Sequence, residues 1–255
     1  GAELISDHSV LIWSNNSLSI SQASVTMERI QNASYGLRCD TGNLSLMACN
    51  LENNLISGDP DKLVLSEASY GVLVGLVGET QTQTQTQTQT QTQTLTLTVS
   101  ECRVKLGDII LSDGFSNLTS GTITMKDSQV TIGSVEGVAD QLDQLGQLGQ
   151  LDQRATGILS KQGSISVLGG SLGFGQLASY ANGVRASSGG ITLDSEPDTS
   201  STQTTSQFSL GAELISEHSV LIWSNNSLSI SQASVTMDRI QNASYGLRCD
   251  TGNLS

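Results

Sequence analysis

Histidine is the residue that most often does acid–base chemistry near neutral pH. This 255-residue chain has two, His8 and His218, which occupy the same place in two copies of one segment. Each copy therefore supplies a single imidazole, too few for a histidine-rich metal cluster and poor material for a Ser–His–Asp triad. We expect the chain not to be an enzyme, with no catalytic residue, no metal site and no cofactor-binding site.

Paired carboxylates are the next arrangement that could support catalysis or cation binding. The pairs are Asp59 with Asp61, Asp140 with Asp143, and Glu196 with Asp198. A calcium-binding nonapeptide would place an aspartate in the pattern GGxGxDxUx, and the segment GGSLGFGQL lacks it. We interpret these acids as solvated turn residues.

Cysteine chemistry is limited in the same way. Cys249 repeats Cys39, and Cys49 and Cys102 complete the set without any CxxC spacing. Cys49 and Cys102 occupy equivalent positions of a shorter motif, which indicates small apolar groups at a corner or in the core. Two alternatives remain for Cys39 and Cys49, a disulfide between them or free buried thiols.

Asparagine sequons suggest covalent modification. The candidate N-glycosylation sites are Asn15, Asn32, Asn43, Asn117, Asn225, Asn242 and Asn253. Asn32 and Asn43 flank SYGLRCDTG, which we expect to be a loop, and they are the best candidates. The sequons favour a glycosylated protein outside the cell or on its surface.

A long repeat determines how these residues are positioned. Residues 211–255 repeat residues 1–45 with two exchanges, Asp7 to Glu217 and Glu28 to Asp238. The simplest interpretation is a tandem array, in which 1–210 is one full unit and 211–255 begins the next. A single duplication is the alternative. The chain starts without Met or a signal peptide, so we expect it to be internal to a longer protein.

A shorter period lies inside the long one. Each unit places apolar residues in alternation on both sides of a small residue, the pattern of strands with one buried face. Equivalent positions are 26 residues apart from Ile20 to Leu46, from Val99 to Met125, and from Val167 to Leu193. The predicted inward side chains are Leu18, Ile20, Val25, Met27, Leu44, Leu46, Leu51, Leu97, Val99, Val104, Leu106, Ile123, Met125, Val130, Ile132, Ile165, Val167, Leu172 and Phe174.

This pattern predicts an all-β fold, a parallel β-helix with coils of about 26 residues. It resembles the parallel β-helix superfamily of pectate-lyase-like proteins and of autotransporter and adhesin stalks, in architecture only. An array of β-sandwiches is the structural alternative. At about 4.8 Å per coil and about eight coils, one period would advance roughly 40 Å.

Three segments depart from the coil pattern. A Thr–Gln run covers 80–94 and continues into LTLTV, either as an extended strand or as an expanded loop. Residues 140–153 have a period of three and are expected to be a loop or short helical insert. Residues 194–209 are expected to be a polar linker before the repeat restarts.

Charge restricts the partners. The net charge is −13 with 11 basic residues and no basic cluster, so nucleic acid is not an expected partner. The longest apolar stretch, 70–78, is far shorter than the roughly 20 residues of a membrane helix. We expect a structural unit of an extracellular filament or surface stalk whose partner is its own neighbouring repeat. A glycan-binding adhesin is the alternative, and a polysaccharide-degrading β-helix enzyme is the least favoured.

Overall fold

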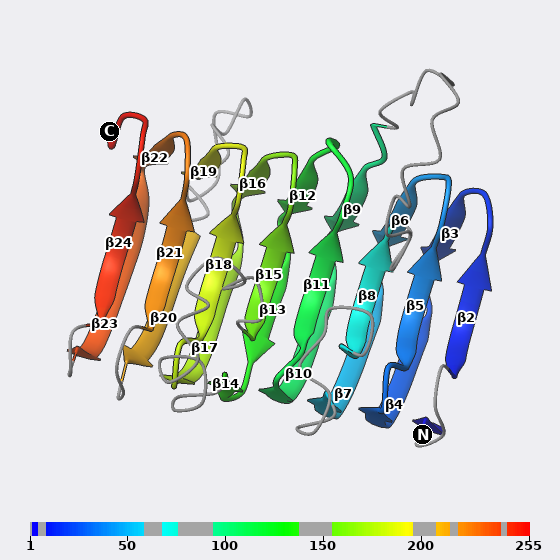
Figure 1. The fold of residues 1–255 in the computed structure, drawn as a ribbon. Coiled ribbons are helices and arrows are strands. Elements are labelled where there is room, and N and C mark those ends of the chain that lie inside the picture. The colour runs from blue at the N-terminus through cyan, green and yellow to red at the C-terminus, as the bar shows by residue number, and fades with distance from the viewer. Residues whose placement is uncertain are drawn as a thin grey trace, which may run out of the picture.

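The computed structural model describes residues 2–4, 9–58, 68–75, 94–137, 155–195, 208–214, 219–240 and 244–255. Within these ranges the chain forms 24 strands and no helix, and every strand pairing is parallel. The strands stack side by side from β2 at one end to β24 at the other (Figure 1). The architecture is therefore all-β and β-solenoid-like. The sandwich alternative is wrong, because immunoglobulin-like sheets pair antiparallel.

The chain visits three sheets, named A, B and C here, in the constant order B, C, A. Sheet C is made of strands of four residues in a continuous ladder. These are β3 (Leu18–Ser21), β6 (Leu44–Met47), β9 (Leu97–Ser100), β12 (Ile123–Lys126), β16 (Ile165–Leu168), β19 (Ile191–Asp194) and β22 (Leu228–Ser231). Their first and third residues face the core, so apolar, hydroxyl, apolar recurs in register along the sheet.

Sheet A follows sheet C across a corner and contains all of the eight-residue strands. It contains β1 (Ala2–Leu4), β4 (Ser24–Gln31), β7 (Asn50–Ser57), β10 (Arg103–Ile110), β13 (Gln129–Ile132), β14 (Val135–Glu136), β17 (Ser171–Ala178), β20 (Phe208–Leu214) and β23 (Ala233–Ile240). Alternation in β10, where Val104 and Leu106 are buried between exposed neighbours, is typical of these strands.

Sheet B was not predicted. It contains β2 (Val10–Ser14), β5 (Tyr35–Cys39), β8 (Tyr70–Val74), β11 (Asp113–Asn117), β15 (Thr156–Ser160), β18 (Asn182–Ala186), β21 (Val220–Ser224) and β24 (Tyr245–Cys249). The expected loop SYGLRCDTG is wrong in its central part, because Tyr35–Cys39 is strand β5 and most of it is buried. Its backbone groups join the parallel ladder between β2 and β8.

A column of glycines explains why sheet B lacks the alternating pattern. Five consecutive coils of the sheet have glycine at the second strand position. At Gly36 an added Cβ would lie 2.5 Å from the carbonyl oxygen of Gly71, and at Gly71 it would lie 2.8 Å from that of Gly114. Real Cβ atoms do not approach this closely, so Gly36 and Gly71 cannot be replaced without a shift of the neighbouring strand. Leu11 and Leu221 interrupt the column at the two copies of the repeat start.

The corner between sheets C and A bends at the residue before the small one. Gln22, Ala48, Glu101 and Asp127 have φ between 46° and 53°, in the left-handed region, and Gly169 follows at 68°. Of the small residues that come next, Cys49, Cys102 and Ser128 are buried. The corner was therefore predicted in the right place, but its bend is made by non-glycine residues in a conformation they rarely adopt.

The core fills the space between the three sheets as one continuous cluster. It includes all the predicted inward residues, with Leu18, Ile20 and Val25 of the first coil only partly buried. Each fully buried aliphatic side chain contributes about 1.5–3 kcal/mol. Because each coil contacts chiefly its neighbours, stability grows by addition of coils.

Register shows how the longer segments are accommodated. Partners in sheet C are 26 positions apart at Leu18–Leu44, Leu97–Ile123 and Ile165–Ile191. At the other steps they are 53, 42 and 37 apart, from Leu44 to Leu97, Ile123 to Ile165 and Ile191 to Leu228. The additional residues fall largely in 59–67, 76–93, 138–154 and 196–207. Residues 80–93 of the first predicted insert, the whole of the second insert, 140–153, and most of the linker 194–209 lie outside the described residues.

One period holds fewer coils than expected. Sheet C passes from β3 to its repeat equivalent β22 in six steps. The predicted number of eight coils is wrong, because three of the six steps contain more than 26 residues. At about 4.8 Å per step, 210 residues advance about 29 Å along the stack.

Candidate assembly interface

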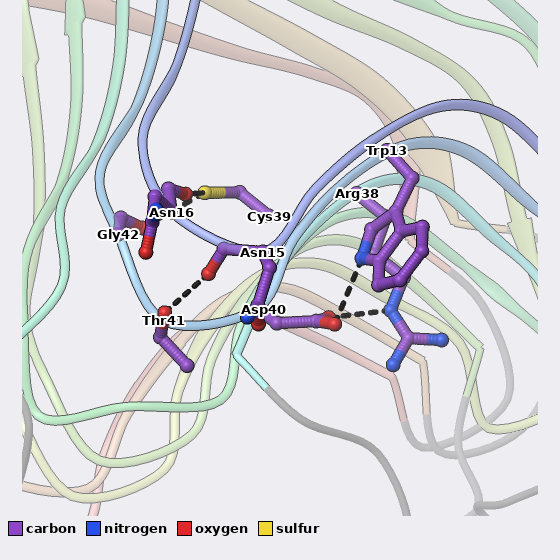
Figure 2. Close-up of polar contacts among 8 residues, drawn as sticks. All are labelled: Trp13, Asn15, Asn16, Arg38, Cys39, Asp40, Thr41 and Gly42. Atoms are coloured by element: carbon purple, nitrogen blue, oxygen red, sulfur yellow. Dashed lines mark hydrogen bonds and ion pairs between the residues drawn. The ribbon is translucent and has the colours of Figure 1, made fainter.

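A tryptophan, an arginine and an aspartate meet on the outer face of sheet B (Figure 2). Trp13 of β2 lies directly opposite Arg38 of β5, and Asp40 follows β5. The indole Nε1 of Trp13 donates to Asp40 Oδ2 at 2.8 Å, and Arg38 Nε donates to Asp40 Oδ1 at 2.6 Å. Asp40 is buried, so both donors are directed at a shielded carboxylate that joins two successive coils.

The turn after this cluster is tied to the coil before it. Thr41 Oγ1 donates to the carbonyl oxygen of Asn15, and the Cys39 thiol donates to that of Asn16 (Figure 2). The same thiol lies 3.1 Å from the carbonyl oxygen of Gly42. Burial raises the pKa of the Cys39 thiol, only partly opposed by a backbone hydrogen bond from Gly42. Cys39 is therefore a neutral donor in a tight turn.

The repeated copy of this cluster gains an additional partner. Trp223 Nε1 donates to Asp250 Oδ2 at 2.9 Å, and Arg248 Nε donates to Asp250 Oδ1 at 2.7 Å. The guanidinium carbons of Arg185 and Arg248 lie 4.3 Å and 4.6 Å from the Trp223 ring centroid. Since these three residues are register partners in β18, β21 and β24, the indole is stacked between two cations.

The pKa of the Asp250 carboxyl reflects its contacts with Trp223 and Arg248. Partial burial alone would raise the pKa of this carboxyl. Hydrogen bonds from Arg248 and Trp223, together with the charges of Arg248 and Arg185, outweigh burial and hold the pKa below its ordinary value. The aspartate is thus ionised and joins Trp223 of β21 to Arg248 of β24, both within the second copy.

The two copies of the repeat start differ in whether a coil precedes them in the stack. Strands β2 and β3 form the N-terminal edge of sheets B and C, whereas β21 and β22 pair with β18 and β19. Trp13 is 62% exposed, whereas Trp223 is half-buried. Leu18 is partly exposed, whereas its copy Leu228 is fully buried. Identical side chains therefore lose exposed surface when a preceding coil is present.

At the C-terminal edge of the stack it is the second copy that is more exposed. Tyr35 is 3% exposed beneath β8, whereas its copy Tyr245 in the terminal strand β24 is 50% exposed. Ile30 is fully buried, and its copy Ile240 is 49% exposed. The exposed large apolar side chains of the described chain are concentrated at its two edges, with Met47 as the exception. Both edges consequently have apolar surface that a neighbouring coil covers in the interior.

A second polar group lies on the outer face of sheet B but is buried. Asp113 Oδ2 accepts a hydrogen bond from Ser116 Oγ at 3.2 Å, and Asp113 is the register partner of Tyr70. Burial raises the pKa of Asp113 to about 7, and the Ser116 hydrogen bond and the Arg185 charge oppose this only in part. Burial also raises the pKa of Tyr70, and the charge on Asp113 adds to the effect.

Most described sequons lie where a glycan could be attached. Asn15, Asn43, Asn225 and Asn253 are exposed, and Asn32 is half-buried in a corner with a φ of 55°. The Asn43 side-chain oxygen accepts a hydrogen bond from the Thr96 backbone at 2.8 Å, which leaves its amide nitrogen outside that bond. Asn242 lies outside the described residues.

Among the predicted glycosylation sites within the described residues, Asn117 differs from the others in its surroundings. Its side chain is fully buried in the turn after β11. The amide Nδ2 donates to the carbonyl oxygens of Leu95 at 2.8 Å and Gly121 at 3.2 Å. Its oxygen accepts from the Thr119 backbone at 2.9 Å. A glycan on Nδ2 would displace both donated bonds and fill buried space.

The structure does not contain the Cys39–Cys49 disulfide, the first of the two predicted alternatives. All four cysteines are free thiols. Cys39 lies in the turn between sheets B and C, whereas Cys49 lies one strand later, at the corner between sheets C and A. Cys49 instead neighbours Cys102, whose sulfur accepts the Cys49 backbone N–H at 3.4 Å. Burial raises the pKa of the Cys102 thiol, which is typical of a structural rather than a reactive cysteine.

Several candidates for chemistry lie outside the described residues, namely His8, His218, Asp59, Asp61, Asp140, Asp143, Glu196 and Asp198. Within the described part of the chain, no three His, Cys, Asp or Glu side chains form a group that could hold a metal ion. Among those same residues, no helix has the length and apolar character needed to span a bilayer.

Comparison with known proteins adds no relationship. No family model, curated protein or solved structure matches this chain. The candidate interface therefore consists of the two edges of the stack, each with a Trp–Asp–Arg cluster on the outer face of sheet B.

Proposed function

We propose that this chain is a structural repeat of a long β-solenoid, a parallel β-helix built from coils of about 26 residues with inserts. In such an array every repeat start stacks on the last coil of the repeat before it. The product is a fibre or surface stalk whose function is mechanical, with backbone ladders running along its axis.

One observation carries this proposal. The second copy of the repeat start continues all three sheets, through Leu214 on Leu177, Val220 on Asn182, and Leu228 on Ile191. The junction therefore uses the same parallel pairing as the interior of the unit. A continuous ladder leaves no open strand edge between repeats, which opposes irregular aggregation.

The setting that best fits such a fibre is outside the cell or on its surface. The exposed asparagines Asn15, Asn43, Asn225 and Asn253 support covalent N-linked glycans there. Secretion from a host that glycosylates proteins, followed by intact-mass measurement before and after enzymatic glycan removal, tests this part. An unchanged mass would contradict it.

The fibre itself is tested by length. Chains lengthened by one, two and three 210-residue periods are examined by negative-stain electron microscopy. We expect rods whose length increases by about 29 Å per period, six coils at about 4.8 Å each. Separate globular particles joined by linkers, or a length that does not scale with the number of periods, would overturn the proposal.

Adhesion is the second candidate, and one feature favours it. Outward hydroxyl side chains form a register column on sheet C, which comprises Ser19, Ser45, Thr98, Thr124, Ser166, Thr192 and Ser229. A glycan array comparing the unmodified chain with a Thr98→Val, Thr124→Val variant separates the candidates. Binding that the variant loses supports an adhesin.

A further inference from the structure

The surface formed by β17, β18 and β19 is occupied within this chain. Strands β20, β21 and β22 pair with it in order, and the register runs through all three sheets. This contact buries Val220, Leu221, Ile222 and Leu228 completely. It therefore shows how the last coil of one repeat recognises the start of the next.

The N-terminal edge carries the same recognition sequence. Residues 8–27 are identical to residues 218–237, including the described strands β2 and β3. A surface that binds β21 and β22 offers the identical strands β2 and β3 the same contacts, whereas residues 208–210 of β20 have no counterpart at the N-terminal edge. What separates the two is effective concentration, which favours the copy in the same chain.

Arg185 makes this contact specific for a repeat start. The outer column of sheet B runs through Trp13, Arg38, Leu73, Ser116, Leu159, Arg185, Trp223 and Arg248. In this column an arginine comes directly before a tryptophan only at the junction, where Arg185 precedes Trp223. The stacked geometry, 4.3 Å from guanidinium carbon to ring centroid, is within the range of a cation–π contact.

We propose that the N-terminal edge of this chain, β2 and β3 with Trp13 at its outer corner, docks in trans on β17, β18 and β19 of a second copy, with Arg185 selecting it. This inference rests on the proposed function and adds a non-covalent route of assembly to it. Docking in trans replaces residues 211–255 of the second copy, so each chain accepts one partner and presents its own edge to another. Linear oligomers follow.

The duplication supplies a matched pair of variants. Trp223→Ala weakens the copy in the same chain and leaves Trp13 intact, whereas Trp13→Ala does the reverse. Sedimentation velocity over a concentration series is expected to show oligomers for Trp223→Ala and monomer for Trp13→Ala. The double variant is expected to return to monomer, because neither copy then offers an indole to Arg185.

Arg185→Ala in the Trp223→Ala background tests the selecting residue. We expect the oligomer dissociation constant to rise about 3- to 30-fold. Arg103→Ala, on the outer side of sheet A, is the control and is expected to leave the constant unchanged. Loss of the effect in the Arg185 variant, or an equal effect of the control, would overturn the role of Arg185.

Hydrogen exchange guards against a variant that merely unfolds. Peptides ending at Glu28 and Asp238 differ in mass, so the two copies are measured separately. In Trp223→Ala, exchange of residues 10–28 is expected to slow as concentration rises, because that edge becomes covered. Equal sedimentation of the two single variants with no such protection would overturn the inference. That result would leave the rod-length test of the covalent fibre unaffected.

Discussion

The rings of Tyr35 and Tyr70 stack in neighbouring coils, with centroids 5.7 Å apart and planes inclined by 4°. Arg38, three residues later in the same strand, lies over the Tyr35 ring, with its guanidinium carbon 4.7 Å from the centroid. Tyr245, the second copy of Tyr35, lies in the last strand of its sheet and is half exposed. One sequence therefore has two environments, and their difference is the contribution of a following coil.

Tyr70→Ala is expected to reduce the free energy of unfolding by about 3–5 kcal/mol, the range for large aromatic deletions in a core. Tyr245→Ala is the matched control and should cost less than about 1 kcal/mol, as exposed substitutions do. Urea denaturation followed by circular dichroism measures both. Equal losses would contradict the assigned stacking.

Asp113 is expected to make stability depend on pH. Its pKa is raised from 3.8 to about 7 in the folded chain, so between these values the folded state binds more protons than the unfolded state. Stability is then greatest below pH 4 for this group and falls as pH rises through 7, by up to about 4 kcal/mol. The groups facing it are Ser116, Thr156, Arg185 and Tyr70.

The measurement is the urea midpoint between pH 4 and pH 8, compared for the unmodified chain and Asp113→Asn. The variant has no titrating group at this position, so its midpoint should vary less over this range. Parallel curves would show that Asp113 does not carry the pH dependence.

Asn53 is expected to be a site where stability can be gained. It is buried, and neither its amide nitrogen nor its oxygen has a hydrogen-bond partner. Its register partners on the two sides are Met27 and Leu106, so the aligned positions are apolar. Asn53→Leu should raise stability by about 1–3 kcal/mol by removing the cost of an unsatisfied amide. Asn54→Leu, an exposed neighbour, is the control, and a similar gain there would exclude this explanation.

Cys39 and Cys249 should differ in reactivity although their surroundings in sequence are identical. Cys39 is fully buried by the next coil, whereas Cys249 in the terminal strand is partly exposed. Brief alkylation of the native chain should therefore modify Cys249 first. Tryptic peptides starting at the two cysteines differ in length, so mass spectrometry distinguishes them. Equal rates would mean that the next coil does not protect Cys39.

Asn117 should be structural rather than glycosylated. Asn117→Gln is expected to lower stability by about 1–3 kcal/mol, because a longer side chain cannot keep all three buried hydrogen bonds. Asn15→Gln should change stability by less than about 0.5 kcal/mol. Thermal unfolding compares them, and a glycan found on Asn117 of the folded protein would refute the assignment.

Sequence periodicity was sufficient for two of the three sheets. Strands such as β6 and β13 bury every second residue, and this alternation is directly visible in the residue types. Sheet B could not be found this way, because its second position is glycine in most coils and several outward side chains are buried. The recurring glycine after Tyr35, Tyr70 and Asp113 was the available signal.

The candidate interface was harder to predict for a different reason. Trp13 and Asp40 are 27 residues apart, and only the coil register brings them within hydrogen-bonding distance. Arg185 and Trp223 are 38 residues apart, a separation that differs from the coil length of about 26 residues because additional residues lie between their strands. The repeat itself was evident. Which side chains become register partners, however, depends on how many residues lie between successive strands, and this number differs from coil to coil.

The all-parallel pairing gives the molecule a direction. Every strand of a sheet points the same way, so the edge that carries Trp13 and the edge that carries Tyr245 are chemically different surfaces. Two copies cannot meet through the same edge by a two-fold axis while continuing the parallel ladder. Any fibre built from these repeats is therefore polar, with distinct growing and terminating ends, and a molecule that caps one end will not cap the other.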